Sequence, residues 1–297
     1  MRHPLRKIRY IGEMGLIYPA LALFDALPVS ASARFAAALG SLAYAADTRR
    51  RNTACENIRR SGIAANEAEV RRIAKASFRH FAGVIADSLN TDRLFADGNW
   101  RNHVRMEIAP ESMRILEDPA TGVILASGHL GNWEIAAQFL STIKPVVGIT
   151  RRMNNPYADA LMQERKPRHR FRLTPKHDAD MGRFLAALKA GEALALLVDQ
   201  HAPRTKGMPI DFFGSPASTH TSPALLHLIT RTPLCFGYCV KTGPDAFLFK
   251  APPPIEITRT GKRETDVRAI LEALTRELEA AIRQYPEQYL WAHRRWR

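Results

Sequence analysis

Cysteine is scarce in this chain of 297 residues, which contains only Cys55, Cys235 and Cys239. Three thiols at these spacings form neither a disulfide framework nor a metal-ligand pattern, and they indicate a reducing compartment. No histidine pair has the spacing typical of zinc ligands, so we predict no metal site. The chain also has no internal repeat and no low-complexity tract, which leaves one large globular domain as the simplest organisation.

Acidic residues are outnumbered by basic ones, 29 against 43, and the formal net charge is +14. Such an excess favours an anionic partner: nucleic acid, a phospholipid surface, an acidic carrier protein or a phosphorylated substrate. The motifs of nucleic-acid-binding domains, the Walker A loop and the dinucleotide fingerprint are all missing. We therefore predict no nucleic-acid partner and no bound nucleotide cofactor. A basic, solvated surface without any partner is the alternative.

Long apolar runs are missing too. The uncharged stretch 14–24 lies between Glu13 and Asp25 and is too short for a membrane-spanning helix, which needs about 20 residues. Basic residues precede this stretch, and a second apolar segment, 35–46, is followed by three consecutive arginines. Apolar stretches flanked by basic side chains are typical of helices that lie in a membrane interface. We predict a membrane-associating helical segment over residues 1–50.

Two other interpretations of the N-terminus are an ordinary core helix pair and a signal peptide. Glu13, Asp25, Pro19 and Pro28 interrupt the apolar region that a signal peptide requires. We therefore expect the N-terminal residues to be retained.

The rest of the chain alternates between strand and helix patterns. Strands are predicted at 123–127, 145–150, 193–198, 234–240 and 246–250. Helices are predicted at 132–141, 156–166, 178–190, 218–231 and 264–284, after a long helical pattern over 66–89. Such alternation predicts an α/β fold with a largely parallel sheet covered by helices. In such sheets ligands bind at the carboxyl ends of the strands, where His129, Arg151 and Asp199 are expected to converge.

The segment Ser127-Gly-His129-Leu-Gly-Asn-Trp-Glu134 follows the first of these strands and contains the most informative pair of residues. With His129 in the turn and Glu134 in the first helical turn, imidazole and carboxylate can meet. A histidine oriented by a carboxylate is a general base. A purely structural hydrogen-bonded pair is the alternative. Backbone N–H groups of Gly131 and Asn132 are candidate oxyanion donors, or ordinary donors at a helix start.

Four blocks of sequence resemble the late lipid A acyltransferases, the lauroyl/myristoyl transferase family. They are the His129 block, Ile149-Thr-Arg151 with Asn155-Pro156, Val198-Asp-Gln200 with Phe212-Phe-Gly214 and Ala217-Ser-Thr219, and the ending from Tyr285 to Trp296. Asn57-Ile-Arg59 and Phe78-Arg-His80 are similar to the N-terminal helical part of this family. Thr150 departs from the pattern, because the family often has tyrosine there.

The resemblance implies a glycerolipid-acyltransferase-like fold, with residues 51–297 as the acyltransferase domain. It implies transfer of a fatty acyl group from acyl carrier protein, or from coenzyme A, to a hydroxyl of a lipid A precursor. Ornithine lipids and glycolipids are alternative acceptors. The acyl thioester is a co-substrate, and no other cofactor is implied. The implied location is the inner, cytoplasmic membrane, with the active site facing the cytoplasm.

The resemblance also assigns site residues. His129 is the general base and Glu134 its orienting acid. Arg151 binds an acceptor phosphate, since guanidinium binds phosphate in a bidentate fork. Further substrate-binding positions are Arg168, Arg170, Asp199, Gly214 and Thr219.

Each of these further positions has a plainer interpretation. The two arginines fit a solvated basic loop, Asp199 and Gly214 fit turns, and Thr219 fits a helix cap.

Two functions outside this family are also weighed. One is a hydrolase with Ser127 and His129, although the chain has no Gly-x-Ser-x-Gly elbow around this serine. The other is a non-enzymatic basic protein that coats anionic membranes, which gives His129 and Glu134 no role.

Overall fold

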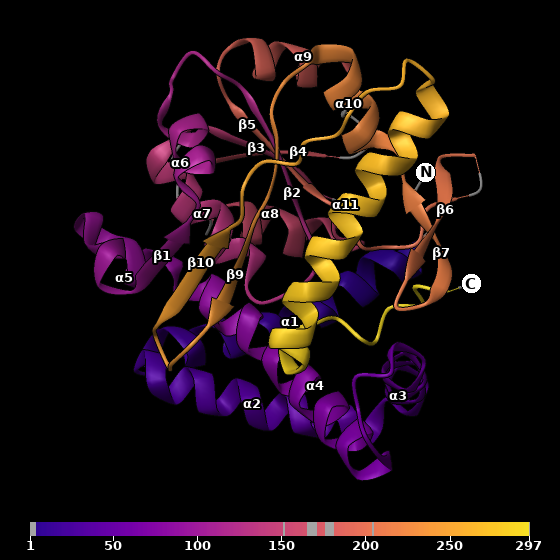
Figure 1. Ribbon diagram of the computed structural model, residues 1–297. Helices are drawn as coiled ribbons and strands as arrows, with labels where there is room; N and C mark the ends of the chain where they lie inside the picture. Colours follow the sequence, from indigo (N-terminus) through magenta and orange to yellow (C-terminus); the bar gives the residue numbers. More distant parts are fainter. Residues whose placement is uncertain (1–3, 151, 165–170, 176–180, 204, 297) are drawn as a thin grey trace.

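The computed structural model describes residues 4–150, 152–164, 171–175, 181–203 and 205–296. Its first helices are α1 (Pro4–Ala26), α2 (Val29–Ala46), α3 (Thr48–Ser61) and α4 (Glu67–Leu89). The later helices are α5 (Thr91–Phe95), α6 (Pro110–Glu117), α7 (Trp133–Ile143), α8 (Pro156–Glu164), α9 (Met181–Lys189), α10 (Ser222–Thr230) and α11 (Arg263–Gln284), with short 3-10 helices at Ala96–Asn102 and Pro286–Gln288. The helices α2, α3 and α4 lie together at one end of the molecule, below the sheets in Figure 1.

Five parallel strands form the central sheet, in the order β4-β3-β5-β2-β8. Their bounds are β2 (Val123–Ser127), β3 (Val146–Thr150), β4 (Phe171–Pro175), β5 (Ala193–Leu197) and β8 (Leu234–Phe236). Short apolar runs are typical of parallel strands that are covered on both faces, and residues 123–126 of β2 are all buried. The predicted α/β fold with a largely parallel sheet is confirmed. The turns after β2 and β5 lie side by side, because these strands are neighbours.

A second sheet has the order β1-β10-β9, with β1 (Val104–Ile108) parallel and β9 (Tyr238–Lys241) antiparallel to β10 (Phe247–Ala251). Gly237 alone separates β8 from β9, and its N–H donates to the carbonyl of Ala126 at 3.0 Å. The predicted strand 234–240 is therefore two strands in two sheets.

A two-stranded hairpin of β6 (Gly207–Phe212) and β7 (Ser215–His220) lies beside the central sheet. The sequence pattern did not predict this hairpin, because its strands are rich in proline, serine and threonine and contain no apolar run. The strands β1 and β4 were not predicted either. This hairpin also shortens the predicted helix 218–231: residues 218–220 pair in β7, and α10 begins at Ser222.

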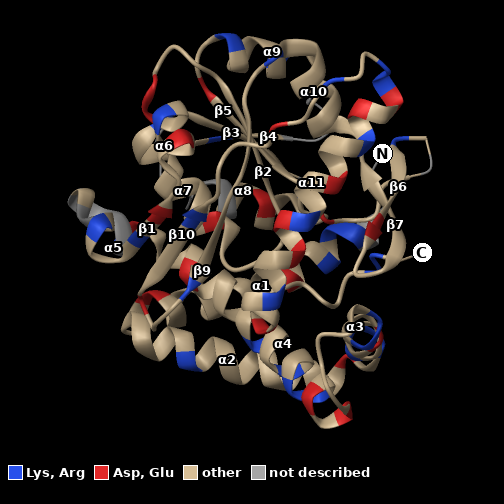
Figure 2. Cartoon of the chain, in the orientation of Figure 1, with Lys and Arg blue, Asp and Glu red and all other residues tan. Residues whose placement is uncertain are grey.

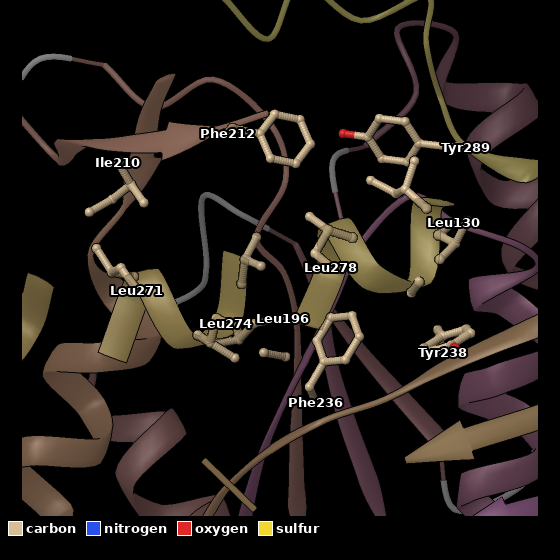
Figure 3. Packing of buried hydrophobic residues seen from close by; sticks show 14 of the residues in the cluster. Leu130, Leu196, Ile210, Phe212, Phe236, Tyr238, Leu271, Leu274, Leu278 and Tyr289 are labelled. Carbon is tan, nitrogen blue, oxygen red and sulfur yellow. The ribbon is translucent and has the colours of Figure 1, made fainter. Parts of the chain in front are cut away.

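The helix α11 covers the central sheet and contributes much of the largest core. Leu271, Leu274 and Leu278 recur at helical spacing and are all nearly fully buried. Figure 3 shows these leucines among Leu196, Phe236, Ile210 and Phe212, which come from the central sheet and the hairpin. Burying a leucine side chain contributes about 1.5–3 kcal/mol. This core holds the hairpin and the sheet together behind the turns that follow β2 and β5.

The helix α2 packs on α4 at very close range. A Cβ atom at Gly40 would lie 2.6 Å from the Cα of Arg79, so only glycine permits this approach of the two backbones. The boundary predicted after residue 50 falls within α3, so a division there would cut a helix. Within the described part of the chain, no helix has both the length and the apolar composition to cross a bilayer. The membrane-associating role of residues 1–50 stays a prediction.

Candidate active site

The turn between β2 and α7 is fixed by hydrogen bonds along its backbone. The N–H of Gly131 donates to the carbonyl of Gln288 at 2.9 Å, and the N–H of Asn132 donates to that of Cys239 at 2.6 Å. The side chain of Asn132 then caps α7 by accepting from the N–H of Ile135 at 3.0 Å. The two backbone donors predicted for an oxyanion are therefore already engaged within the protein.

His129 contacts Asp199, which follows the neighbouring strand β5. Its Nδ1 lies 2.8 Å from Oδ1 of Asp199, and its backbone N–H donates to Oδ2 at 2.9 Å. Both oxygens of this buried carboxylate are thus used by the same histidine. A carboxylate can only accept, so Nδ1 carries the proton and Nε2 holds the lone pair of a neutral imidazole. The contact with Asp199 therefore leaves Nε2 as the basic nitrogen of the ring.

The pKa values of this pair follow from its burial and its opposite charges. Burial lowers the pKa of His129, but the charge of Asp199 and the hydrogen bond with it raise the pKa more, so the net shift is upward from 6.5. Burial raises the pKa of Asp199, but the charge of His129, its two hydrogen bonds and the charge of Arg295 leave it below 3.8. Asp199 is therefore ionised at neutral pH.

The orienting contact that we expected from Glu134 is made by Asp199. The hydrogen bonds of the His129 ring go to Asp199 and Gln200, whereas Glu134 lies in the first turn of α7 and has its own interactions. The spacing argument correctly placed His129 in the turn and Glu134 in the first turn of the helix, but it did not show which carboxylate the imidazole contacts. Any role of Glu134 in catalysis stays a prediction.

Two side chains of the C-terminal segment, Arg295 and Tyr289, interact with Asp199, which the sequence did not predict. Arg295 is buried, and its guanidinium donates to the carbonyl of Ser218 at 2.5 Å and to the hydroxyl of Thr219 at 2.6 Å. The hydroxyl of Tyr289 lies beside Asp199, and burial followed by the charge of that carboxylate raises the tyrosine pKa well above 10.0. Tyr289 therefore stays neutral next to the ionised aspartate.

The helix α4 contacts the turn between β2 and α7. The Nε2–H of His80 donates to the carbonyl of Gly131 at 2.9 Å, and burial lowers the pKa of His80 to about 4, so this ring is neutral. Asp87 is buried, forms an ion pair with Lys241 and accepts from the side chain of Asn132 at 3.1 Å. The turn is thus held by α4, β9 and the C-terminal segment together.

The remaining predicted positions fall in three different settings. Arg151, Arg168 and Arg170 lie outside the described residues, so their roles stay predictions. Gly214 has a φ of +72° and, with Phe213 at +51°, forms the two-residue turn of the β6–β7 hairpin. Thr219 is buried, and its hydroxyl is engaged with Arg295. These contacts favour the plainer interpretation of Gly214 as a turn residue and give Thr219 a supporting position, and neither is seen to face the His129 ring.

The hydrolase alternative and metal binding can both be compared with this geometry. The hydroxyl of Ser127 is buried without a hydrogen-bond partner among the described residues, and the His129 ring contacts Asp199 and Gln200 instead. The geometry therefore offers no activated serine of the hydrolase type. Among the described residues, no three histidine, cysteine or acidic side chains are close enough together to hold a metal ion.

Known proteins that resemble this chain are described as acyltransferases. A family model described as bacterial lipid A biosynthesis acyltransferase matches residues 2–297. The chain is 23% identical to the lipid A biosynthesis lauroyltransferase of Escherichia coli K12, over 99% of its own length and 93% of that protein. It is 25% identical to a phosphatidylinositol mannoside acyltransferase of Mycolicibacterium smegmatis, over 60% of its own length and 58% of that protein. The second match thus spans less than two thirds of the mycobacterial relative.

Proposed function

Because the chain belongs to the bacterial lipid A biosynthesis acyltransferase family, we propose that it transfers a fatty acyl group to a hydroxyl of a lipid A precursor or a related lipid. The family and both relatives make the chain an acyltransferase. The acceptor, the acyl donor and the role of His129 are the parts that we propose.

The contact between His129 and Asp199 carries this proposal. Asp199 accepts a hydrogen bond from Nδ1–H of His129, with 2.8 Å between Nδ1 and Oδ1, so Nε2 is the basic nitrogen. A base that takes the hydroxyl proton as the new bond forms typically raises the reaction rate by a factor of about 10² to 10⁴. The buried carboxylate then stabilises the imidazolium that results.

The reaction needs no acyl-enzyme, because a thioester is already activated. The acceptor oxygen attacks the thioester carbonyl carbon while its proton passes to Nε2 of His129. The C–S bond then breaks, and the leaving sulfur takes the proton back from His129. An ester and a free thiol are formed, and the histidine is neutral again.

The acceptor is an anionic lipid in this proposal. The two relatives are named for different lipids, lipid A and phosphatidylinositol mannoside, which keeps a glycolipid or an ornithine lipid as alternatives. Arg151, Arg168 and Arg170 remain our proposed contacts for its charged groups.

Acyl carrier protein is the proposed donor, and coenzyme A is the alternative. The formal net charge of +14 suits an acidic carrier, since complementary charge speeds association. The thioester is a co-substrate, so the proposal includes no resident cofactor.

The first two helices are the proposed membrane contact. Their exposed large apolar side chains are Ile8, Ile11, Tyr18, Leu23, Phe35, Leu39 and Leu42. The helix α3, which follows directly, contains five arginines, and Figure 2 shows it rich in basic residues where α2 is almost without charge. Apolar side chains next to arginines fit the interface of an anionic bilayer. We propose that the protein lies at the cytoplasmic face of the inner membrane.

Lipid analysis tests this proposal. Membrane lipids are compared by mass spectrometry between cells with the gene, cells without it, and cells complemented with wild type or His129→Ala. We expect one lipid class to lose one acyl chain without the gene and to regain it only with wild type. Unchanged lipids, or full complementation by His129→Ala, would contradict the proposal.

A further inference from the structure

The side chain of Gln200 lies against the reactive nitrogen of His129. Its Nε2 is 3.3 Å from Nε2 of the imidazole, while the preceding residue, Asp199, holds Nδ1 at 2.8 Å. Because Nδ1 carries the ring proton, Nε2 is an acceptor, and the amide N–H of Gln200 donates to it. Two consecutive residues after β5 therefore contact the two ring nitrogens of one histidine.

This position is the one that an acceptor hydroxyl must occupy. A hydroxyl that is to lose its proton lies within about 2.6–3.2 Å of the base. One lone pair cannot accept fully from both the hydroxyl and the amide, so the arriving hydroxyl displaces the amide of Gln200. The displaced N–H then lies beside the reacting atoms without its former acceptor.

The transition state needs donors for the negative charge that develops on the acyl carbonyl oxygen. Several backbone N–H groups of the catalytic turn are already committed within the protein: those of His129, Gly131, Asn132 and Ile135. The amide of Gln200 differs from them, because substrate binding itself releases it.

We propose that Gln200 is a catalytic residue, which caps Nε2 of His129 in the free enzyme and, once displaced, donates its side-chain N–H to the acyl carbonyl oxygen. The backbone of Gln200 is anchored meanwhile, since Arg295 donates to its carbonyl at 3.4 Å. Gln200 neither gains nor loses a proton during the reaction. This role rests on the proposed function, because it requires an acyl donor and a hydroxyl acceptor.

Kinetics of a near-isosteric variant test the donor role. Gln200→Met keeps the length of the side chain and removes its N–H, so kcat should fall about 100- to 1,000-fold. KM for either substrate should change little, because the contact forms only in the transition state. Gln284→Met, at the exposed end of α11, is the matched control and should keep wild-type kcat. An unchanged kcat in Gln200→Met would overturn the donor role.

Nitrogen-15 NMR of labelled histidine tests the cap without any substrate. A donor to Nε2 stabilises the neutral ring, so its removal in Gln200→Met should raise the pKa of His129 by about 0.4 to 1. An unchanged pKa and an unchanged Nε2 signal would overturn the cap. A wild-type enzyme that transfers no acyl group while this signal responds would instead contradict the proposed function.

Discussion

Three hydrogen bonds to Asp199 and Gln200 are among the contacts that hold His129 before any substrate arrives. Asp199 accepts from its ring and from its backbone, and the amide of Gln200 lies at its other ring nitrogen. The carboxylate raises the pKa of the imidazole above 6.5 despite its burial, and the amide lies at the position that we propose for the substrate hydroxyl. The rate of the reaction should therefore depend on pH through this one group.

The variant Asp199→Asn tests that dependence. Catalysis needs neutral His129, so kcat/KM of the wild type should rise with pH through a midpoint above 6.5. Without the carboxylate charge the midpoint should move to lower pH, and the maximal rate should fall roughly 1,000- to 10,000-fold. The measurement is kcat/KM between pH 5 and 9.

Glu134→Gln is the matched control for this experiment. Because the His129 ring bonds to Asp199 and Gln200, this change should leave the midpoint where it is in the wild type. A midpoint that moves in Glu134→Gln and not in Asp199→Asn would restore the assignment expected from the sequence.

The same pair also makes stability depend on pH. Because the pKa of His129 is raised in the folded protein, this group stabilises the fold fully below pH 6.5. The stabilisation is lost as the pH rises through the pKa of His129 in the folded state. Because the pKa of Asp199 is lowered in the folded protein, this group stabilises the fold above pH 3.8. The stabilisation is lost as the pH falls through the pKa of Asp199 in the folded state. The difference in unfolding free energy between wild type and Asp199→Asn, measured in urea, should therefore be largest from pH 3.8 to pH 6.5. A difference that grows steadily above pH 6.5 would contradict this assignment.

The sequence predicted that His129 and Asp199 lie at one edge of the sheet, and the structure brings them together, but it did not predict that they contact each other. Short spacing favoured Glu134, and Asp199 was expected in the same crevice as a substrate contact. Which of two carboxylates meets an imidazole depends on side-chain directions, which follow from how β2 and β5 pair. Arg295 and Tyr289 could not be assigned because their contacts at this site join residues that are far apart in the sequence, 76 to 95 positions for Arg295.

The turn before α7 packs tightly against β9. Gly131 has a φ of +62°, and a Cβ atom there would lie 2.0 Å from the carbonyl oxygen of Cys239 in β9. The N–H of the next residue donates to that same oxygen. Glycine is thus required both by the backbone conformation and by the contact with β9.

Gly131→Ala should destabilise the protein far more than an alanine at a similar backbone angle elsewhere. The matched control is Gly62→Ala, whose φ is +63° at the end of α3 and whose added Cβ would meet no atom within 4 Å. The control should cost about 1 kcal/mol of unfolding free energy. Gly131→Ala should cost several times as much, because a backbone oxygen must move. Equal costs in urea unfolding would show that the contact with β9 can relax.

Apolar strands and amphipathic helices were predictable from local pattern, and polar strands were not. The predicted strand 123–127 matches β2, and the predicted helix 264–284 matches α11 within one residue. The β6–β7 hairpin was missed because its stability comes from packing against α11, where Ile210 and Phe212 meet the leucines of that helix. The pair Phe213-Gly214 at its turn was the one local signal that could have revealed it.

Apolar and charged side chains are distributed unevenly over the surface of the molecule. The helices α1 and α2 expose large apolar side chains, and α2 carries almost no charge, whereas charged residues are spread over the other elements (Figure 2). No described helix is long and apolar enough to span a bilayer. An interfacial contact through these two helices is the arrangement that we propose, with the sheets above it.

Replacing Ile8, Ile11 and Leu42 together by serine tests this arrangement. These side chains are between 55% and 67% exposed, so the folded protein should tolerate the change. Each removed side chain should weaken membrane binding by about 1 kcal/mol or more, and the triple variant at least tenfold. Ile229→Ser on α10, with 65% exposure, is the matched control and should bind normally. The measurement is sedimentation with anionic vesicles, and equal binding of all three proteins would place the contact elsewhere.

The most direct measurement is acyl transfer by purified enzyme from a labelled acyl carrier protein thioester to a phosphorylated glucosamine lipid. We predict transfer by the wild type and a loss of at least about 100-fold in His129→Ala, because the general base contributes that much. Circular dichroism and urea unfolding would establish that the variant is folded. A folded His129→Ala that transfers the acyl group at the wild-type rate would contradict the central claim that His129, held by Asp199, is the base.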